Sequence, residues 1–204
     1  SKMTGTPLPP VVLASASPQR REMLEALGIP FTVSEPEVEE VTHGEPREVV
    51  LANALLKARS VAEPGHLTIG CDTEVVLDGR LLGKPGDALR AHEYIAQLSG
   101  RTHLVLSGLA VIGPDADDVR TGIAETAVVF RELTMEGVDA YVASGEWEGR
   151  AGGYAIQGVG SGMVESIEGD LSNVIGLPVP LLAGLAPELP IPAGTDVPAP
   201  RGDV

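Results

Sequence analysis

Residues 11–31 read VVLASASPQRREMLEALGIPF, and this stretch leads a strand directly into a helix. The apolar run 11–15 predicts a short buried strand. Ser17 suits a helix N-cap and Pro18 the first helical position, where a missing N–H costs nothing. Gly28 predicts the end of the helix. A strand that passes at once into a helix is typical of α/β proteins.

The same alternation of strands and helices continues along the chain. Predicted helices cover 46–61, 87–98, a segment beginning at Thr134 and 180–185, and predicted strands cover 31–34, 67–77, 102–112, 119–133 and 163–167. Because the two kinds of element are interleaved, we expect an α/β fold. The length of 204 residues suits one domain, which we place at 9–186. Residues 187–204 are rich in Pro, Ala and Gly, and we expect a disordered tail there.

The composition excludes several classes of partner. The net charge is −15, which disfavours a surface that clamps a nucleic-acid polymer but leaves room for a small anion. The single cysteine, Cys71, excludes an internal disulfide framework and a multi-cysteine zinc site. No apolar run approaches the length of a membrane span, and the first residues lack a signal-peptide pattern. We therefore expect a cytoplasmic protein without a membrane partner.

The loop before the first helix is the first candidate binding site. A helix N-terminus offers free N–H groups and the positive end of a dipole, which suits phosphate. Ser15 and Ser17 could add hydroxyl donors, and Arg20 could grip phosphate oxygens with its planar fork. The alternative is an ordinary capped helix with solvated arginines.

Lysine is used sparingly, which draws attention to the positions where it occurs. The chain has eleven arginines but only three lysines, Lys2, Lys57 and Lys84. Lys57 lies on a predicted helix that is otherwise largely apolar, and Lys84 lies between Gly and Pro in a loop. Both would supply a compact ammonium to an anionic ligand. The alternative is that they are surface lysines.

Two carboxylates are candidates for catalysis or metal binding. Asp72 ends the apolar run of a buried strand, and a carboxylate at the end of a strand can hold a divalent cation or activate a water. Turn chemistry with Thr73 is the structural alternative. Glu40 is a candidate second carboxylate, although most such glutamates are simply solvated.

A glycine-rich stretch, EGRAGGYAIQGVGSG at 148–162, could approach a ligand closely. The amide of Gln157 within it is able to read a base edge. The stretch is not a dinucleotide-binding fingerprint, because its glycine spacing differs and it precedes a predicted strand rather than opening a helix.

Six stretches taken together resemble the Maf family of nucleoside triphosphate pyrophosphatases. In order along the chain they are LASASPQRREMLEALGI, LLKARSVA, GCDTEVVLDGRLLGKPGDALRA, LSGRTHLVLSGLAV, YVASGEWEGRAGGYAIQGVGSGMVESIEGD and SNVIGLP. They span roughly residues 11–185. The resemblance implies an elongated mixed-sheet fold related to the inosine triphosphate pyrophosphatases, with two lobes around a central cleft. It also implies a possible homodimer.

The resemblance further implies that Mg²⁺ or Mn²⁺ assists hydrolysis of a nucleoside triphosphate to a monophosphate and pyrophosphate. The implied catalytic residues are Asp72, Lys84, Lys57 and Glu40, with Asp72 and Glu40 also holding the metal. The implied substrate-binding residues are Ser15, Ser17, Arg20, Thr73, Gln157 and Gln19. A nucleotide-sensing regulator of septum formation, with weak or no turnover, is the alternative function.

The chain departs from the family pattern at two places. Gln19 stands where the family commonly has the first arginine of Ser-Pro-Arg-Arg, a position associated with preference for dTTP and UTP. Thr73, RTH at 101–103 and IQG at 156–158 still favour that subgroup. The second departure is CDTEV, where the family often has ADTVV; we assign these changed positions no catalytic role.

Overall fold

The computed structural model describes residues 7–192 and residue 194, and one mixed sheet organises them. Its strand order is β2-β1-β3-β5-β6-β7, with β4 paired to β3 as well. The strands are β1 (Val11–Ala14), β2 (Thr32–Val33), β3 (Leu67–Leu77), β4 (Arg80–Leu82), β5 (Thr102–Ile112), β6 (Val119–Phe130) and β7 (Val164–Glu168). Strand β1 pairs in parallel with β2 and β3, whereas all other pairs are antiparallel. The predicted α/β fold with a mixed sheet is confirmed.

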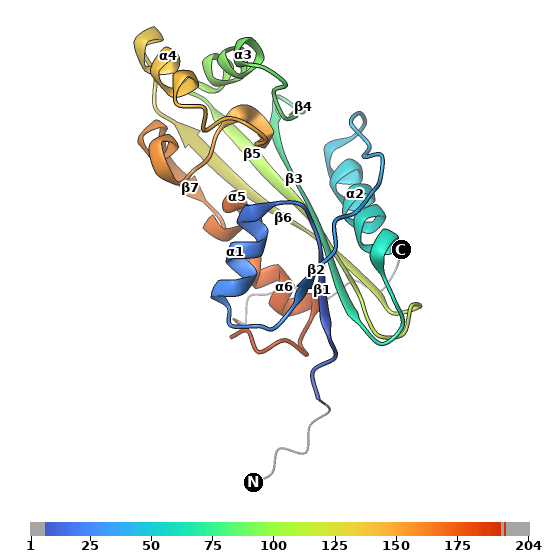
Figure 1. The fold of residues 1–204 in the computed structure, drawn as a ribbon. Helices are drawn as coiled ribbons and strands as arrows, with labels where there is room; N and C mark the ends of the chain where they lie inside the picture. The colour runs from blue at the N-terminus through green and yellow to red at the C-terminus, as the bar shows by residue number, and fades with distance from the viewer. Residues whose placement is uncertain (1–6, 193, 195–204) are drawn as a thin grey trace.

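Helices cover both faces of this sheet. They are α1 (Pro18–Ala26), α2 (Pro46–Val61), α3 (Ala88–Leu98), α4 (Met135–Ala143), α5 (Leu171–Ile175) and α6 (Val179–Leu185). In Figure 1 the long strands β3, β5 and β6 run through the molecule, with α3 and α4 at one end and α1 and α6 at the other. Helix α2 packs on the face opposite to α1 and α6 (Figure 1). Within the described residues, no helix is long and apolar enough to cross a membrane.

The apolar core on the face that carries α1 and α6 is divided in two. The β1 cluster joins residues of β1, α1 and α6 to the first half of β3, and includes Leu13, Leu24 and Leu182. The α3 cluster joins α3 and α4 to the second half of β3, and includes Ile95 and Tyr141. Two packed ends on one continuous sheet agree with the two lobes expected from the sequence.

Helix α2 lies unusually close to the sheet because glycines face it. A Cβ atom on Gly70 of β3 would be 2.9 Å from the Cβ of Ala58, and one on Gly108 of β5 would overlap the backbone carbonyl of Val50. The helix therefore contacts the strands backbone to backbone. Because α2 lies so close, its side chains can reach the backbone and side chains of β3.

Several predicted boundaries differ from those observed. Strand β6 ends at Phe130 rather than at 133, and the predicted strand 31–34 contains only two paired residues. Packed structure also continues past the predicted domain end at 186, since Leu189 is buried in the β1 cluster. Of the predicted tail 187–204, residues 193 and 195–204 lie outside the described residues.

Candidate active site

The candidate site is built around an interruption in the pairing of β3. On one edge of this strand, β1 pairs with Leu67–Gly70 and β4 pairs with Val75–Leu77. Among the described strands, none covers residues 71–74 between these two pairings. Successive side chains of a strand alternate between faces, so Thr73 faces the α1 side and Asp72 faces α2. Groups from both faces can therefore meet around this free edge.

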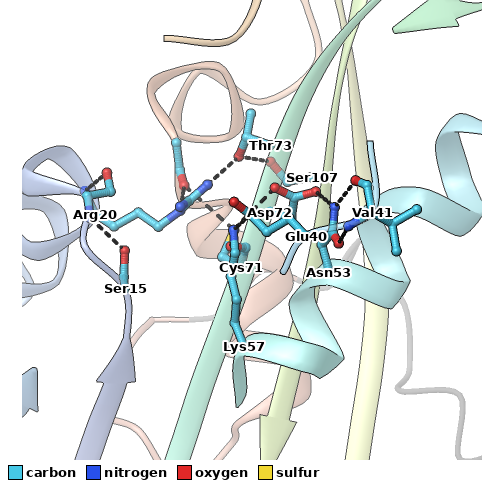
Figure 2. A network of polar contacts seen from close by, with 12 residues as sticks. Ser15, Arg20, Glu40, Val41, Asn53, Lys57, Cys71, Asp72, Thr73 and Ser107 are labelled. Atoms are coloured by element: carbon cyan, nitrogen blue, oxygen red, sulfur yellow. Dashed lines mark hydrogen bonds and ion pairs between the residues drawn. The ribbon is translucent and has the colours of Figure 1, made fainter. Parts of the chain in front are cut away.

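Lys57 of α2 holds two carboxylates together at this edge. Its Nζ lies 2.7 Å from Glu40 Oε1 and 3.3 Å from Asp72 Oδ1, and it donates to the carbonyl of Cys71 at 3.3 Å (Figure 2). Asp72 is buried, whereas Glu40 is partly exposed. The sequence analysis selected the two carboxylates and Lys57 separately and grouped them as catalytic residues by resemblance; the structure places both carboxylates in contact with Lys57.

Asn53 completes the cluster, and the sequence analysis did not select it. Its Nδ2 donates to Asp72 Oδ2 at 3.0 Å and to the carbonyl of Val41 at 2.9 Å, while its Oδ1 accepts from the Val41 N–H at 2.7 Å (Figure 2). It therefore ties the loop that carries Glu40 to the strand that carries Asp72. The signal was an asparagine four residues before Lys57 on the buried side of an apolar helix.

Arg20 of α1 reaches the face of β3 that carries Thr73, opposite to the face that carries Asp72. Its Nε donates to the carbonyl of Gly176 at 2.7 Å, and its Nη2 donates to Thr73 Oγ1 at 2.9 Å. Thr73 Oγ1 in turn lies 2.7 Å from the Oγ of the buried Ser107 on β5. Arg20 is thus oriented by its neighbours, and Ser107 is a second residue that the sequence analysis did not select.

The serines of the first loop shape its backbone. Ser17 is the N-cap of α1 as predicted, because its Oγ accepts from the Arg20 N–H at 3.3 Å. Ser15 Oγ accepts from the Ser17 N–H at 2.9 Å, and Ser17 Oγ donates to Gln19 Oε1 at 3.1 Å. These contacts give the loop a defined form at the edge of the cleft. A role in phosphate binding stays a prediction.

The predicted residues converge on one cleft of about 670 Å³ between the β1 and α3 clusters. Those that line it are Ser15, Ser17, Gln19, Arg20, Glu40, Lys57, Thr73, Lys84 and Gln157. Asp72 does not line the cleft directly, and it reaches the cluster through Lys57. The volume falls in the range of small-molecule sites.

Charges in the cleft act on each other. Partial burial alone would raise the pKa of Glu40, but the hydrogen bond and charge of Lys57, with Lys84 and Arg20 nearby, lower it below its ordinary value. Burial, reinforced by the negative charge of Asp72, raises the pKa of Glu74 to about 8. The neighbouring cations therefore keep Glu40 ionised, whereas burial beside Asp72 favours the protonated form of Glu74.

The donor set fits a hard divalent cation that is shared with a substrate. Glu40 and Asp72 present carboxylate oxygens on either side of Lys57 Nζ, and Glu74 Oε2 is buried without a hydrogen-bond partner in the described part of the chain. In residues 7–192 and 194, no three acidic, His or Cys side chains already surround one point. Mg²⁺ is commonly held by one or two carboxylates together with substrate phosphates, and Glu40 and Asp72 are the carboxylates that could hold it here.

Comparisons with known proteins show which proteins this chain is similar to. A sequence model of the family described as Maf-like protein matches residues 10–189. A dTTP/UTP pyrophosphatase from Moorella thermoacetica is 48% identical over 173 residues, which cover 83% of this chain and 89% of that protein. A dTTP/UTP pyrophosphatase from Bacillus cereus is 45% identical, covering 83% of this chain and 90% of its own.

Among solved structures, a nucleoside-triphosphatase / dITP/XTP pyrophosphatase from Mycobacterium abscessus aligns with 60% of this chain and 75% of its own. The TM-score is 0.41 and the sequence identity 22%.

Proposed function

The chain belongs to the Maf-like protein family, and from this premise we propose that it is a nucleoside triphosphate pyrophosphatase. In this reaction a water oxygen bonds to the α-phosphorus, and the bond from that phosphorus to the oxygen bridging to the β-phosphate breaks. The products are a nucleoside monophosphate and pyrophosphate. A nucleotide sensor with little turnover, the alternative drawn from the sequence, is not favoured by relatives that are themselves pyrophosphatases.

One observation of the structure supports the proposal most directly. In a chain of net charge −15, Lys57, Lys84 and Arg20 line one cleft, and Lys57 contacts two carboxylates there. A triphosphate responds to the local field rather than to the total charge. The three cations would neutralise phosphate charge as it develops on the leaving pyrophosphate.

The carboxylates supply the complementary part of the chemistry. We propose that Asp72 and Glu40 hold Mg²⁺ or Mn²⁺, which when bound offsets phosphate charge and polarises the phosphoryl group. The alternative role for Asp72 is to take a proton from the attacking water. Asn53 keeps the Asp72 carboxylate oriented toward Lys57, because Asn53 Nδ2 donates to one oxygen of Asp72 and Lys57 Nζ to the other.

We propose dTTP and UTP as the preferred substrates, which is the activity in the names of the relatives. Gln157 and Thr73 line the cleft on two different segments and are the polar groups proposed to read the base. Hydrogen-bonding sites discriminate strongly between bases, because a mismatched base leaves a buried polar group unpaired.

The assay that tests the proposal incubates a panel of nucleoside triphosphates with Mg²⁺ or Mn²⁺ and identifies the products. We expect monophosphate and pyrophosphate, with dTTP and UTP consumed fastest. Orthophosphate as the first product would exclude a pyrophosphatase, and no turnover of any nucleotide would exclude an enzyme of this class.

Asp72→Asn tests the role of the central carboxylate. The substitution keeps the shape of the side chain but removes the charge, so we expect turnover to fall by about 100-fold or more. Circular dichroism and the melting temperature should still report a folded protein. Activity close to that of the wild type would remove Asp72 from the catalytic role.

The remaining expectations concern the cell and the assembly. We propose that the protein acts in the cytoplasm on free nucleotides and that it forms a homodimer. Light scattering coupled to gel filtration tests the assembly, because a dimer would have twice the chain mass of 21.1 kDa. A species at the mass of one chain across the working concentration range would contradict the dimer.

A further inference from the structure

The glycine-rich loop closes around a carboxylate of the protein itself. Glu146 lies just after α4, and its Oε2 accepts from the Val159 N–H at 3.0 Å while its Oε1 accepts from the Gly160 N–H at 2.9 Å. The Tyr141 hydroxyl donates to the same Oε1 at 3.0 Å. The N–H groups of Val159 and Gly160 are therefore occupied by a carboxylate of the protein and are not free to bind a phosphate.

Glycine is required where the loop meets this carboxylate. A Cβ on Gly158 would lie 2.5 Å from Glu146 Oε2, and the backbone there has a φ of +67°, which other residues rarely adopt. A Cβ on Gly160 would overlap the carbonyl of Ala155 and lie 3.1 Å from Glu146 Oε1. The sequence analysis attributed these glycines to the approach of a ligand, and the structure shows them approaching Glu146.

The start of the loop is tied to the same scaffold. The Ala155 N–H donates to the Tyr141 hydroxyl at 3.0 Å, so Tyr141 links Glu146 to the start of the loop, while Glu146 binds the later residues directly. The Tyr154 hydroxyl shares a 2.6 Å hydrogen bond with Nε2 of the buried His103. These ties lie on both sides of Gln157.

Gln157 itself is left available by this arrangement. It is exposed on the wall of the cleft, and within the described residues no hydrogen bond engages its side-chain amide. A side chain that must read a base gains from a backbone already held in place, because less ordering then accompanies binding.

We propose that Glu146 is a positioning residue for base selection: its carboxylate holds residues 155–160 closed before substrate arrives, so that the Gln157 amide meets the base at a defined place. This inference rests on the proposed function. It adds a residue that acts on the base through the loop it holds, and it assigns the loop to the base rather than to the phosphates.

A carboxylate suits this role better than a neutral side chain. Glu146 accepts three hydrogen bonds with its two oxygens, all from groups that only donate to it. In Glu146→Gln the amide nitrogen would oppose an N–H group, whereas in Glu146→Ala all three donors would lose their partner. Glu146→Ala should therefore loosen the loop more than Glu146→Gln.

The experiment compares steady-state kinetics with dTTP and dCTP for wild type, Glu146→Gln, Glu146→Ala and the control Glu136→Gln. Glu136 is exposed in the first turn of α4 and does not line the cleft, and among the described residues its side chain makes no hydrogen bond. We expect Glu146→Ala to raise KM for dTTP about tenfold, with a much smaller change in kcat, because the base is held less well while the reacting groups stay in place. The preference for dTTP over dCTP should fall in step, and Glu136→Gln should resemble the wild type.

Chemical rescue distinguishes positioning from a general loss of packing. Removing the side chain in Glu146→Ala leaves two N–H groups and a hydroxyl around a space that formate or acetate can fill. Either anion should lower the KM of Glu146→Ala toward the wild-type value, and chloride at equal ionic strength should not. If Glu146→Ala does not fold, the isosteric Glu146→Gln carries the test through its smaller rise in KM and loss of base preference.

Three results would overturn the inference while leaving the proposed function intact. They are unchanged KM and base preference in both Glu146 variants, a fall in kcat without a change in KM, and an equal effect of Glu136→Gln. An inactive wild type would instead refute the proposed function. Binding of dTMP, measured by calorimetry, then tests the loop independently of turnover, and equal affinity in wild type and Glu146→Gln would reject the role of Glu146.

Discussion

Asp72 and Glu74 are neighbours on the same face of β3, yet their surroundings differ. Both oxygens of Asp72 are paired, one with Asn53 and the other with Lys57. Glu74 Oε2 is buried without a partner in the described residues, and burial with the nearby charge of Asp72 raises the pKa of Glu74 to about 8. A buried carboxyl group of this kind is held at a cost in stability whenever it ionises.

Replacing Glu74 with valine should stabilise the protein, and more so at alkaline pH. Below its ordinary pKa of 4.5 the carboxyl is protonated in both states; as pH rises toward about 8, only the folded state keeps the proton, so stability falls through this window. We expect Glu74→Val to raise the melting temperature more at about pH 8.5 than at about pH 5. The control Glu165→Val removes an exposed carboxylate from β7, and it should show no such trend. An equal gain from Glu74→Val at both pH values would contradict the interpretation.

Gln19 is the residue at which the substrate preference is most open to change. Its Oε1 accepts from the Ser17 hydroxyl at 3.1 Å, and the side chain lines the cleft. Gln19→Arg would add a charge with several donors at this wall. We expect the ranking of nucleotides to shift, with dTTP and UTP gaining, while the products stay the same. Competition assays with mixed nucleotides measure the ranking, and an unchanged order would count against this role.

At the scale of elements, α2 shows what sequence patterns can and cannot give. Its bounds, Pro46–Val61, agree with the predicted 46–61, because proline at the first position and a regular apolar face are local signals. The role of Asn53 was missed, since an asparagine has a meaning only once Val41 and Asp72 are placed beside it.

Pushing α2 away from the sheet should damage the site without touching any of its polar residues. A Cβ at Gly108 would collide with the backbone of Val50 in α2, so Gly108→Ala should cost about 1–3 kcal/mol of stability. Lys57 and Asn53 move with the helix, and we therefore expect activity to fall as well. Denaturant titration and kinetics test both effects. Gly162→Ala, where a Cβ meets nothing within 4 Å, is the control for stability.

In the site too, contacts within one segment were predictable from the sequence and contacts between segments were not. The strand-to-helix turn and its Ser17 cap follow from residues within one short segment. The contacts of Ser107 with Thr73, and of Glu146 with Gly160, join segments whose neighbours only the tertiary fold decides. Helix α5 was not predicted, because five residues are too few to show a helical period.

For the whole molecule, the important feature is that the cleft takes its cations from segments on both sides. Arg20 comes from α1, Lys84 follows β4 and Lys57 comes from α2, so a bound triphosphate would contact both packed ends. Ligand binding should therefore stabilise the entire fold rather than one region.

A dTTP analogue that cannot be cleaved between the α- and β-phosphates tests this at the level of the whole protein. At about 100 times its Kd it should add about 2.7 kcal/mol, which corresponds to a rise in melting temperature of roughly 5–10 °C. Lys84→Ala should reduce this rise at the same analogue concentration, whereas Arg59→Ala, at an exposed position late in α2, should not. Equal shifts in both variants would show that Lys84 does not contact the ligand.

The composition of the β1 cluster has a consequence for synthesis. Leu13 and Leu24, from the first segments made, pack against Leu177 and Leu182, from the last. During translation β1 and α1 can therefore complete their packing only after nearly the whole chain has been made. The β3–β5–β6 meander pairs strands that follow one another in sequence and can form earlier. A chain that ends before Leu177 would leave the apolar side of β1 and α1 uncovered, and such fragments should aggregate or be degraded.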